Sequence, residues 1–222
     1  MTTYRIAVIG GTGPQGKGLA YRFAKHGHQV VIGSRAAEKA EPIASEIAER
    51  ITEEGGSPVV SGAANTDAAA GADVVLLAVP FSGHDELVES LAEQLSGKTI
   101  ISCVNPLGFD KGGPYGLDVE RSAAEAAQAI VPTATVVGAF HHVAAASLWS
   151  GADFLDHEDI LVCGDDADGK EIAQEMARAV TSHVGIDAGK LRLARQLEPL
   201  TAVLISINKK YKVRSGISIA GV

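Results

Sequence analysis

Three glycines near the N-terminus, Gly11, Gly13 and Gly16, follow an apolar run and precede a segment with helical spacing. This GxGxxG spacing between a strand and a helix is typical of the turn on which the pyrophosphate of a dinucleotide binds. Such glycines allow a tight turn, a close approach of the backbone to the pyrophosphate and close packing of the helix on the strand. The helix N-terminus also presents backbone N–H groups to the anion. We therefore expect a dinucleotide site; a strand-to-helix turn without a ligand is the alternative.

The glycine spacing alone does not define a family. Gly10, Gly13 and Gly16 also fit the GxxGxxG spacing of short-chain dehydrogenases and of NADP-sensing regulators. Short-chain dehydrogenases also carry a Tyr-x-x-x-Lys pair, and Tyr21 and Lys25 have that spacing. These two residues lie on the first predicted helix, too far from the carboxyl ends of the strands to reach a nicotinamide. We interpret the pair as a chance match.

The second predicted strand ends in Ser34 and Arg35 rather than in an acidic residue. A carboxylate at this point binds the ribose 2′-hydroxyl of NAD but repels the 2′-phosphate of NADP. A Ser hydroxyl and an Arg guanidinium both donate hydrogen bonds to that phosphate. Lys39 follows one helical turn later and can face the same anion. The pattern predicts a preference for NADP; the alternative is a solvated helix start, which the nearby Glu38 and Glu41 fit.

These motifs lie within a regular alternation of strands and helices. Short β-branched runs are predicted as strands at residues 4–10, 28–33, 57–62, 72–80, 98–106 and 134–140. Helical segments lie between them at residues 15–26, 37–54, 83–95 and 119–130. We therefore expect an α/β fold with a Rossmann-type doubly wound parallel sheet of about six strands.

The chain beyond this sheet is short. It contains a predicted strand at residues 159–166, a helix at 169–183 and a last helix at 193–212. We predict a Rossmann NADP-binding domain at residues 1–150 and a small C-terminal α/β extension at residues 151–222.

Composition and charge exclude several classes of partner. Asp and Glu outnumber Lys and Arg by 27 to 19, a net charge of −8, which argues against nucleic acid or an anionic membrane surface as the partner. The two cysteines, Cys103 and Cys163, do not make a disulfide framework and fit a reducing cytoplasm. The longest apolar run, residues 74–81, is too short to span a bilayer, and no export signal is evident. We expect a cytoplasmic protein.

Three predicted loops meet at the carboxyl ends of the strands, where ligands bind in such a sheet. The first contains Val79, Pro80 and Phe81, which could line a ribose and nicotinamide site or simply pack the strand end. The second, residues 105–116, is rich in Gly and Pro and long enough for a binding loop or a mobile cover. The third, residues 140–147, opens with two histidines and continues with small apolar residues, which leave room for a flat ring.

The adjacent histidines of the third loop, His141 and His142, do not predict a metal site. Neighbouring side chains on an extended chain point in opposite directions, and no further ligand motif flanks them. We expect at least one of them to hydrogen-bond a substrate ring; a core histidine with satisfied hydrogen bonds is the alternative.

A basic run near the C-terminus contrasts with the acidic chain. It consists of Lys209, Lys210, Lys212 and Arg214. Cations are favoured at a helix C-terminus, which explains the run without a ligand. The functional alternative is a binding patch for the acidic tail of a substrate.

Several segments together resemble the NADPH-dependent coenzyme F-420 (F420) reductases over nearly the whole chain. They are GGTGPQGKGLA at residues 10–20, GSRAAEKA at 33–40, the VP strand end at 79–80, ERSAAE at 120–125, VCGDD at 162–166 and DAGKL...AR.LEPLT at 187–201. The resemblance implies a Rossmann-type N-terminal domain and a homodimer. It also implies that the small C-terminal part, residues 151–222, contributes to the F420 pocket and to the dimer. It also implies hydride exchange between NADP(H) and the 8-hydroxy-5-deazaflavin of F420.

The resemblance further implies which residues bind the two coenzymes. It places on the pyrophosphate Thr12, Gly13, Pro14 and Gln15, and on the 2′-phosphate Ser34, Arg35 and Lys39. It places near the nicotinamide Val79, Phe81, Asn105, Leu107 and Ala145, and beside the deazaflavin His141.

Hydride transfer between two stacked rings needs no protein nucleophile, so we expect no catalytic acid or base. Two other functions remain open. An imine-type reductase of small substrates would need a proton donor and usually a long helical dimerisation domain, for which the residues after Gly151 are too few. A non-enzymatic NADP sensor would need no second ring pocket.

Overall fold

The structure is a computed structural model that describes residues 2–222. Its centre is an eight-stranded sheet of order β10-β9-β8-β5-β4-β1-β2-β3. Six of these strands are parallel: β1 (Arg5–Ile9), β2 (Gln29–Ser34), β3 (Val59–Ala64), β4 (Val74–Leu77), β5 (Thr99–Ser102) and β8 (Thr135–Gly138). The strand order reverses between β1 and β4, where the carboxyl ends of the strands open a crevice for ligands. The predicted doubly wound parallel sheet is confirmed.

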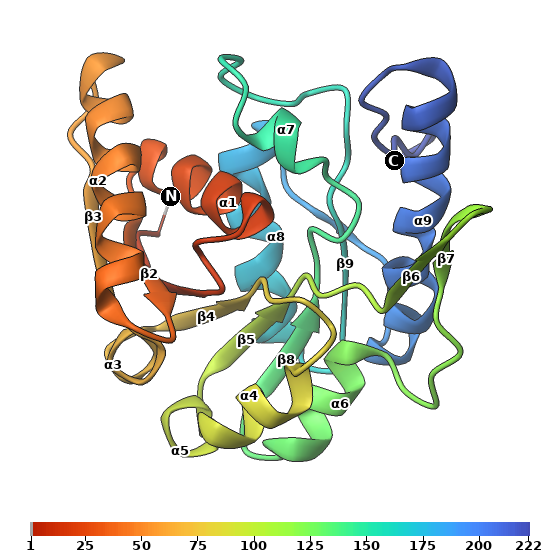
Figure 1. Cartoon of the computed structure of the whole chain (residues 1–222), viewed down its shortest axis with the longest axis horizontal. Helices are drawn as coiled ribbons and strands as arrows, with labels where there is room; N and C mark the ends of the chain where they lie inside the picture. The colour runs from red at the N-terminus through yellow and green to blue at the C-terminus, as the bar shows by residue number, and fades with distance from the viewer. Residues whose placement is uncertain (1) are drawn as a thin grey trace.

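Helices cover both faces of this sheet (Figure 1). One face carries α1 (Pro14–Lys25), α2 (Ala37–Glu53), α7 (Ala145–Leu148) and α8 (Ala167–Thr181). The other face carries α3 (Asn65–Ala70), α4 (His84–Ser90), α5 (Ala92–Leu95) and α6 (Ala123–Ile130). Alternate residues of each strand serve the two cores: on β1, Ile6 and Val8 pack under α1, whereas Ala7 and Ile9 pack on the opposite side.

The start of α6 differs from the sequence prediction, which began this helix near residue 119. Ser122 caps the helix: its hydroxyl accepts a hydrogen bond from the Glu125 N–H at 3.1 Å. The Glu125 carboxylate accepts one in return from the Ser122 N–H at 3.0 Å. This capping box satisfies two N–H groups at the helix end and sets the first helical residue at Ala123.

The C-terminal region continues the same sheet. β9 (Leu161–Gly164) pairs antiparallel with β8, and β10 (Ile186–Asp187) pairs parallel with β9. The turn η1 (Leu191–Leu193) then leads into the last helix, α9 (Ala194–Tyr211). α9 stands beside the carboxyl ends of the strands (Figure 1).

The predicted loop at residues 105–116 forms a two-stranded hairpin, β6 (Leu107–Asp110) and β7 (Gly113–Gly116). The glycines that suggested a loop have structural roles in the hairpin. Gly113 has a φ of +114° at the turn, and a Cβ on Gly116 would lie 2.7 Å from Cβ of Pro199 in α9. The hairpin therefore packs closely against α9.

A buried carboxyl group anchors α9 to the N-terminus of α6. Glu198 is buried and accepts hydrogen bonds from the N–H groups of Ala123 at 2.8 Å and Ala124 at 3.0 Å. Burial raises the pKa of Glu198 to about 7, and these two hydrogen bonds oppose the rise. Because Glu198 holds α9 against α6, the next residues of α9, from Thr201 on, have a fixed position.

Other features bear on the excluded classes of function. Cys103 and Cys163 are free, buried thiols, and burial raises the pKa of both to about 12. Within residues 2–222, no helix has the length and apolarity needed to cross a membrane. In the same described range, no group of three or more His, Cys, Asp and Glu side chains could hold a metal ion.

Candidate functional site

The glycine turn between β1 and α1 has the geometry that the spacing predicted. Gly10 has a φ of +79°, and its carbonyl oxygen accepts a hydrogen bond from the Gly13 N–H at 3.0 Å. A Cβ on Gly16 would lie 2.7 Å from the Gly10 oxygen, and one on Gly11 would lie 2.8 Å from the Val8 oxygen. Only glycine fits these positions without a shift of the backbone. Gly11 and Gly16 therefore shape the turn, while Gly13 stands at its open side.

Pro14 and Gln15 complete the turn as the first residues of α1. Pro14 occupies the first helical position, where its missing N–H costs nothing. Nε2 of Gln15 donates a hydrogen bond of 3.2 Å to the carbonyl oxygen of Phe140, which ties α1 to the loop after β8. The glycine turn and the histidine loop are thus joined directly.

A cavity of about 610 Å³ opens beside the glycine turn; we call it the phosphate-loop cavity. Five of the predicted phosphate-binding residues line it: Thr12, Gly13, Ser34, Arg35 and Lys39. No carboxylate lies among its lining residues, so Arg35 and Lys39 make it electropositive. Its donors fit a nucleotide carrying a 2′-phosphate.

The sequence interpretation missed Asn65, which lines the same cavity at the start of α3. Its Oδ1 atom is buried and has no hydrogen-bond partner within the described residues. A buried acceptor without a partner is costly, and a ligand hydroxyl in the cavity would satisfy it. This orphan acceptor is a second observation that the cavity fits a polar ligand.

A second cavity, of about 550 Å³, adjoins the first; we call it the ring cavity. It is lined by eight of the predicted residues: Gln15, Val79, Pro80, Phe81, Asn105, Leu107, His141 and Ala145. The predicted residues Gly11, Pro14 and Gly16 line neither cavity. Ala78, Val79 and Pro80 line both cavities, so the end of β4 is where they meet. A dinucleotide bound at the glycine turn could therefore reach the ring cavity past Val79 and Pro80.

His141 is the polar group of the ring cavity most in need of a partner. It is 2% exposed, and neither ring nitrogen has a hydrogen-bond partner within residues 2–222. Burial, together with the neighbouring His142, lowers the pKa of His141 to about 3, so the imidazole is neutral. A neutral imidazole offers one donor and one acceptor, which suits a flat ring with polar edges.

The two histidines have different roles because the chain turns sharply before them. Phe140 has a φ of +63°, a conformation rare for a bulky residue, and its ring packs on Phe23 in the core. Nε2 of His142 lies 2.6 Å from the carbonyl oxygen of Asp159, so His142 is a core histidine with a satisfied hydrogen bond. His141, by contrast, lines the ring cavity.

The last helix supplies one side of the ring cavity, through residues that the sequence analysis did not name. Thr201, Leu204, Ile205 and Asn208 line it. Their spacing is that of one helical face, the only signal in the sequence that grouped them. Asn105 is bound to this helix: its Nδ2 donates to Oγ1 of Thr201 at 3.1 Å.

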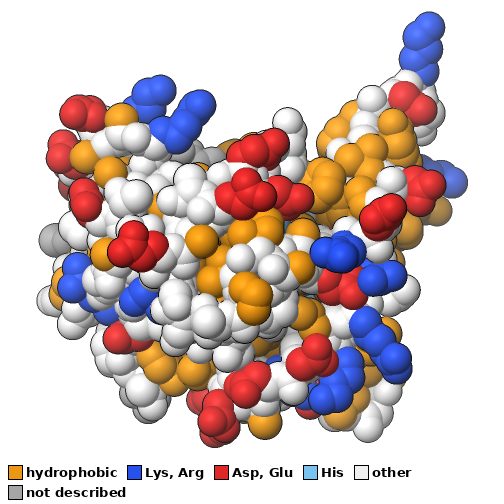
Figure 2. Space-filling model, turned by 90° about the horizontal axis from the view of Figure 1, so that it is seen from below, with side chains coloured by type: hydrophobic (Ala, Val, Ile, Leu, Met, Phe, Trp, Pro, Cys, Tyr) orange, Lys and Arg blue, Asp and Glu red, His pale blue; other side chains and the backbone are white. Residues whose placement is uncertain are grey.

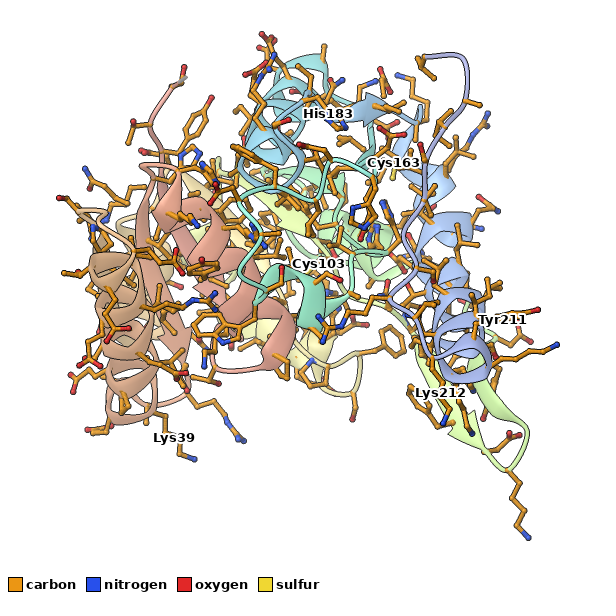
Figure 3. All side chains as sticks on the ribbon, turned by 90° about the horizontal axis from the view of Figure 1, so that it is seen from above. Lys39, Cys103, Cys163, His183, Tyr211 and Lys212 are labelled. Carbon is orange, nitrogen blue, oxygen red and sulfur yellow. The ribbon has the colours of Figure 1, made fainter. Side chains whose placement is uncertain are left out.

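The predicted basic run divides in the structure. Arg214 lines the ring cavity and donates a hydrogen bond of 3.3 Å to the Ala146 oxygen. Lys209, Lys210 and Lys212 are exposed at the end of α9. Figure 3 shows Lys212 on the far side of the molecule from Lys39. The two basic regions thus lie apart in the structure.

The fold and the glycine turn define a Rossmann-type dinucleotide-binding protein with a second, ring-sized cavity. The sequence profile of the family described as NADP oxidoreductase coenzyme F420-dependent matches residues 5–106. The chain is 41% identical over 216 residues to the F420-dependent NADP reductase of Methanothermobacter thermautotrophicus, covering 95% of this chain and 92% of the relative. It is 37% identical over 211 residues to the F420-dependent NADP reductase of Methanocaldococcus jannaschii, covering 94% of each. The chain belongs to this family of F420-dependent NADP oxidoreductases.

A solved structure agrees with this assignment. The crystal structure of a candidate F420-dependent NADP reductase from Arthrobacter sp. FB24 is similar to this chain with a TM-score of 0.80 and 30% identity, covering 98% of this chain and 99% of that one. A pyrroline-5-carboxylate reductase from Coxiella burnetii has a TM-score of 0.60 at 15% identity, which shows a shared fold alone.

Proposed function

We propose that this protein is an F420-dependent NADP reductase, which transfers a hydride between NADP(H) and the deazaflavin of F420. The observation that carries the proposal is the meeting of two cavities at Val79 and Pro80. One cavity has the cations and hydroxyls that suit a nucleotide 2′-phosphate, and the other is apolar with a buried polar edge. A hydride donor and its acceptor can therefore be held in contact in one crevice.

On the NADP side, Arg35, Ser34 and Lys39 bind the 2′-phosphate in this proposal, and residues 12–15 bind the pyrophosphate. The absence of carboxylates from the cavity lining supports this assignment, because an acid there would repel the phosphate. Asn65 adds an acceptor for a ribose hydroxyl.

On the deazaflavin side, His141 offers its free ring nitrogens to the polar edge of the ring. Around the nicotinamide, Phe81, Leu107 and Ala145 supply apolar surface, which excludes water from the transfer. The hydride passes directly between C4 of the nicotinamide and C5 of the deazaflavin, so the protein orients the rings and supplies no nucleophile.

We further propose that residues 151–222 contribute to the ring cavity and to a homodimer. The arm made by the β6–β7 hairpin and α9 carries exposed apolar side chains, and Figure 2 shows hydrophobic surface gathered along this projecting part. Phe109 of the hairpin is 68% exposed, and Tyr211 of α9 is 63% exposed. A second copy of the chain would cover them. The buried free thiols support a reducing, cytoplasmic location.

The dimer is tested by sedimentation of the purified protein and of Phe109→Asp. We expect a dimer for the natural chain and a monomer for Phe109→Asp. Val59→Asp is the matched control, because Val59 is similarly exposed, at 60%, but lies on β3 at the opposite edge of the sheet. A monomeric natural chain, or a dimer in both variants, would contradict the proposal.

The activity is tested by mixing purified protein, NADPH and F420 and following the oxidation of NADPH. We expect turnover that requires both coenzymes. An imine-type reductase would instead consume NADPH only with a small imine, and a sensor would bind NADPH without turnover. Either result would contradict the proposed function.

A further inference from the structure

A buried arginine on α1, Arg22, makes all its side-chain hydrogen bonds to residues 147–153, which follow the residues that line the ring cavity. Arg22 is 0% exposed. Its Nε donates to the Leu148 oxygen at 2.8 Å, and its Nη2 donates to the Ser147 oxygen at 3.1 Å and to Oγ of Ser150 at 3.2 Å. Its Nη1 donates to the oxygens of Ala152 and Asp153, both at 2.6 Å. All these acceptors are neutral, and burial lowers the pKa of the guanidinium.

A buried cation without a bonded carboxylate is costly, so its hydrogen bonds must do something that apolar packing could not. Here the hydrogen bonds of Arg22 satisfy backbone carbonyl groups at the end of α7. This helix, Ala145–Leu148, is a single turn, too short to hold itself together by internal hydrogen bonds. The last carbonyl groups of α7 have no hydrogen-bond partners within the helix. A cation at this end also interacts favourably with the negative end of the helix dipole.

The other end of the same turn faces the ring cavity. Ala144, Ala145 and Ala146 line that cavity. Arg22 therefore fixes the carbonyl end of a turn whose amino end forms part of the cavity wall.

Helices α1 and α7 pack closely against each other. A Cβ on Gly18 of α1 would lie 2.6 Å from Cβ of Leu148. From α2, Arg50 adds hydrogen bonds of 3.0 Å to the oxygens of Trp149 and Ser150. α1 also begins at the glycine turn, so one rigid helix carries both the phosphate-binding turn and the support of the ring cavity wall.

We propose that Arg22 is a positioning residue for hydride transfer: by holding α7 against α1, it sets where the deazaflavin lies relative to the nicotinamide. This inference rests on the proposed function. Misplacement of two reacting carbons by about 1 Å can cost about 100-fold in rate. Arg22 does not line the phosphate-loop cavity, where the phosphates of NADPH bind in the proposed function, so loss of Arg22 should separate the transfer rate from NADPH binding.

The test compares Arg22→Met, Arg22→Lys and Gly18→Ala with the surface control Arg178→Met on α8. Active sites are counted by NADPH titration, and single-turnover rates are measured per site. We expect Arg22→Met to slow hydride transfer about 10- to 100-fold and to raise KM for F420, with Kd for NADPH changed less than about twofold. Arg22→Lys keeps the charge but not the planar fork and restores part of the rate. Gly18→Ala pushes Leu148 away and gives the same pattern as Arg22→Met.

If Arg22 only stabilised the fold, its variants would show a lower Tm and fewer active sites, with normal kcat and KM at each remaining site. Normal kcat and KM per site in Arg22→Lys and Gly18→Ala would overturn the inference. These two variants test the inference even if Arg22→Met does not fold. An equal loss of NADPH and F420 binding would also overturn it. Absence of F420 turnover in the natural protein would be a separate result, because it refutes the proposed function and this inference with it.

Discussion

The hydroxyl of Thr201 donates a hydrogen bond of 2.8 Å to the backbone oxygen of His141, joining the last helix to the loop at the end of β8. Nδ2 of Asn105 donates to the same oxygen at 3.0 Å. The backbone of His141 is therefore fixed from two sides, while its ring nitrogens have no hydrogen-bond partner in the described part of the chain. A side chain held in place with unused hydrogen-bonding groups is what a binding site for a polar ring requires.

Replacement of Arg35 by Ala should weaken NADPH selectively. Loss of a charge-assisted hydrogen bond typically costs about 1.5–3 kcal/mol, which is about tenfold or more in affinity. We expect KM for NADPH to rise by this factor in Arg35→Ala while KM for NADH hardly changes, as measured in steady-state assays with each cofactor. Equal increases for both cofactors would remove Arg35 from the 2′-phosphate site.

Replacement of His141 by Ala should act on F420 and spare NADPH. His141 lines the ring cavity but not the phosphate-loop cavity. We expect slower transfer or a higher KM for F420, and an unchanged Kd for NADPH by fluorescence titration. Because its pKa is lowered to about 3, His141 stays neutral above about pH 5, and its loss should leave the shape of the pH–rate profile unaltered. A basic limb that disappears with His141 would contradict this role.

The buried Glu198 carboxyl group that anchors α9 to α6 should make the free energy of unfolding depend on pH. Its pKa is raised by burial to about 7, above the value of an unfolded Glu, so the folded state holds the proton more tightly. This contribution is fully present below the unfolded pKa of about 4.3 and is lost as pH rises through about 7, by at most about 4 kcal/mol. We expect urea unfolding to show a smaller difference in unfolding free energy between acidic and alkaline conditions in Glu198→Gln than in the natural chain. The same pH dependence in both would exclude Glu198 as its source.

The basic run at residues 209–214 should contribute to F420 affinity through the acidic tail of this coenzyme. Arg214 lines the ring cavity, and the three lysines near it are exposed, so any attraction is screened by salt. We expect KM for F420 to rise with salt more steeply than KM for a deazaflavin without the tail, and Arg214→Gln to reduce that difference. If both acceptors respond equally to salt, the run only caps α9.

The parts of the fold and site that follow from local pattern were predictable. The alternation of β-branched runs and helical segments predicts the parallel sheet, because each signal lies within a few residues. Gly11, Gly13 and Gly16 lie in one turn, and Ser34 and Arg35 end one strand, so their proximity is a matter of sequence. The residues named there do line or shape the phosphate-loop cavity; that they bind NADP stays a prediction.

The rest depends on contacts between distant segments. Thr201 reaches the ring cavity only because Glu198 anchors α9 on α6, and nothing near Thr201 in the sequence indicates this. The hairpin at 107–116 pairs residues that read as a loop because Gly and Pro are rare in strands. The sequence around Arg22 gives no sign of its role, because its hydrogen-bond acceptors, residues 147–153, are distant in the sequence and come near only in the fold.

The central claim is direct hydride transfer between two rings held in adjoining cavities, and isotope transfer tests it most directly. NADPH carrying deuterium at C4 is mixed with F420 and the protein in ordinary water, separately for each of the two C4 positions. We predict that one of the two labels passes to C5 of the deazaflavin without loss to solvent, since the transfer is direct and no acid or base intervenes. Label recovered in water, or no F420-dependent oxidation of NADPH, would contradict the account.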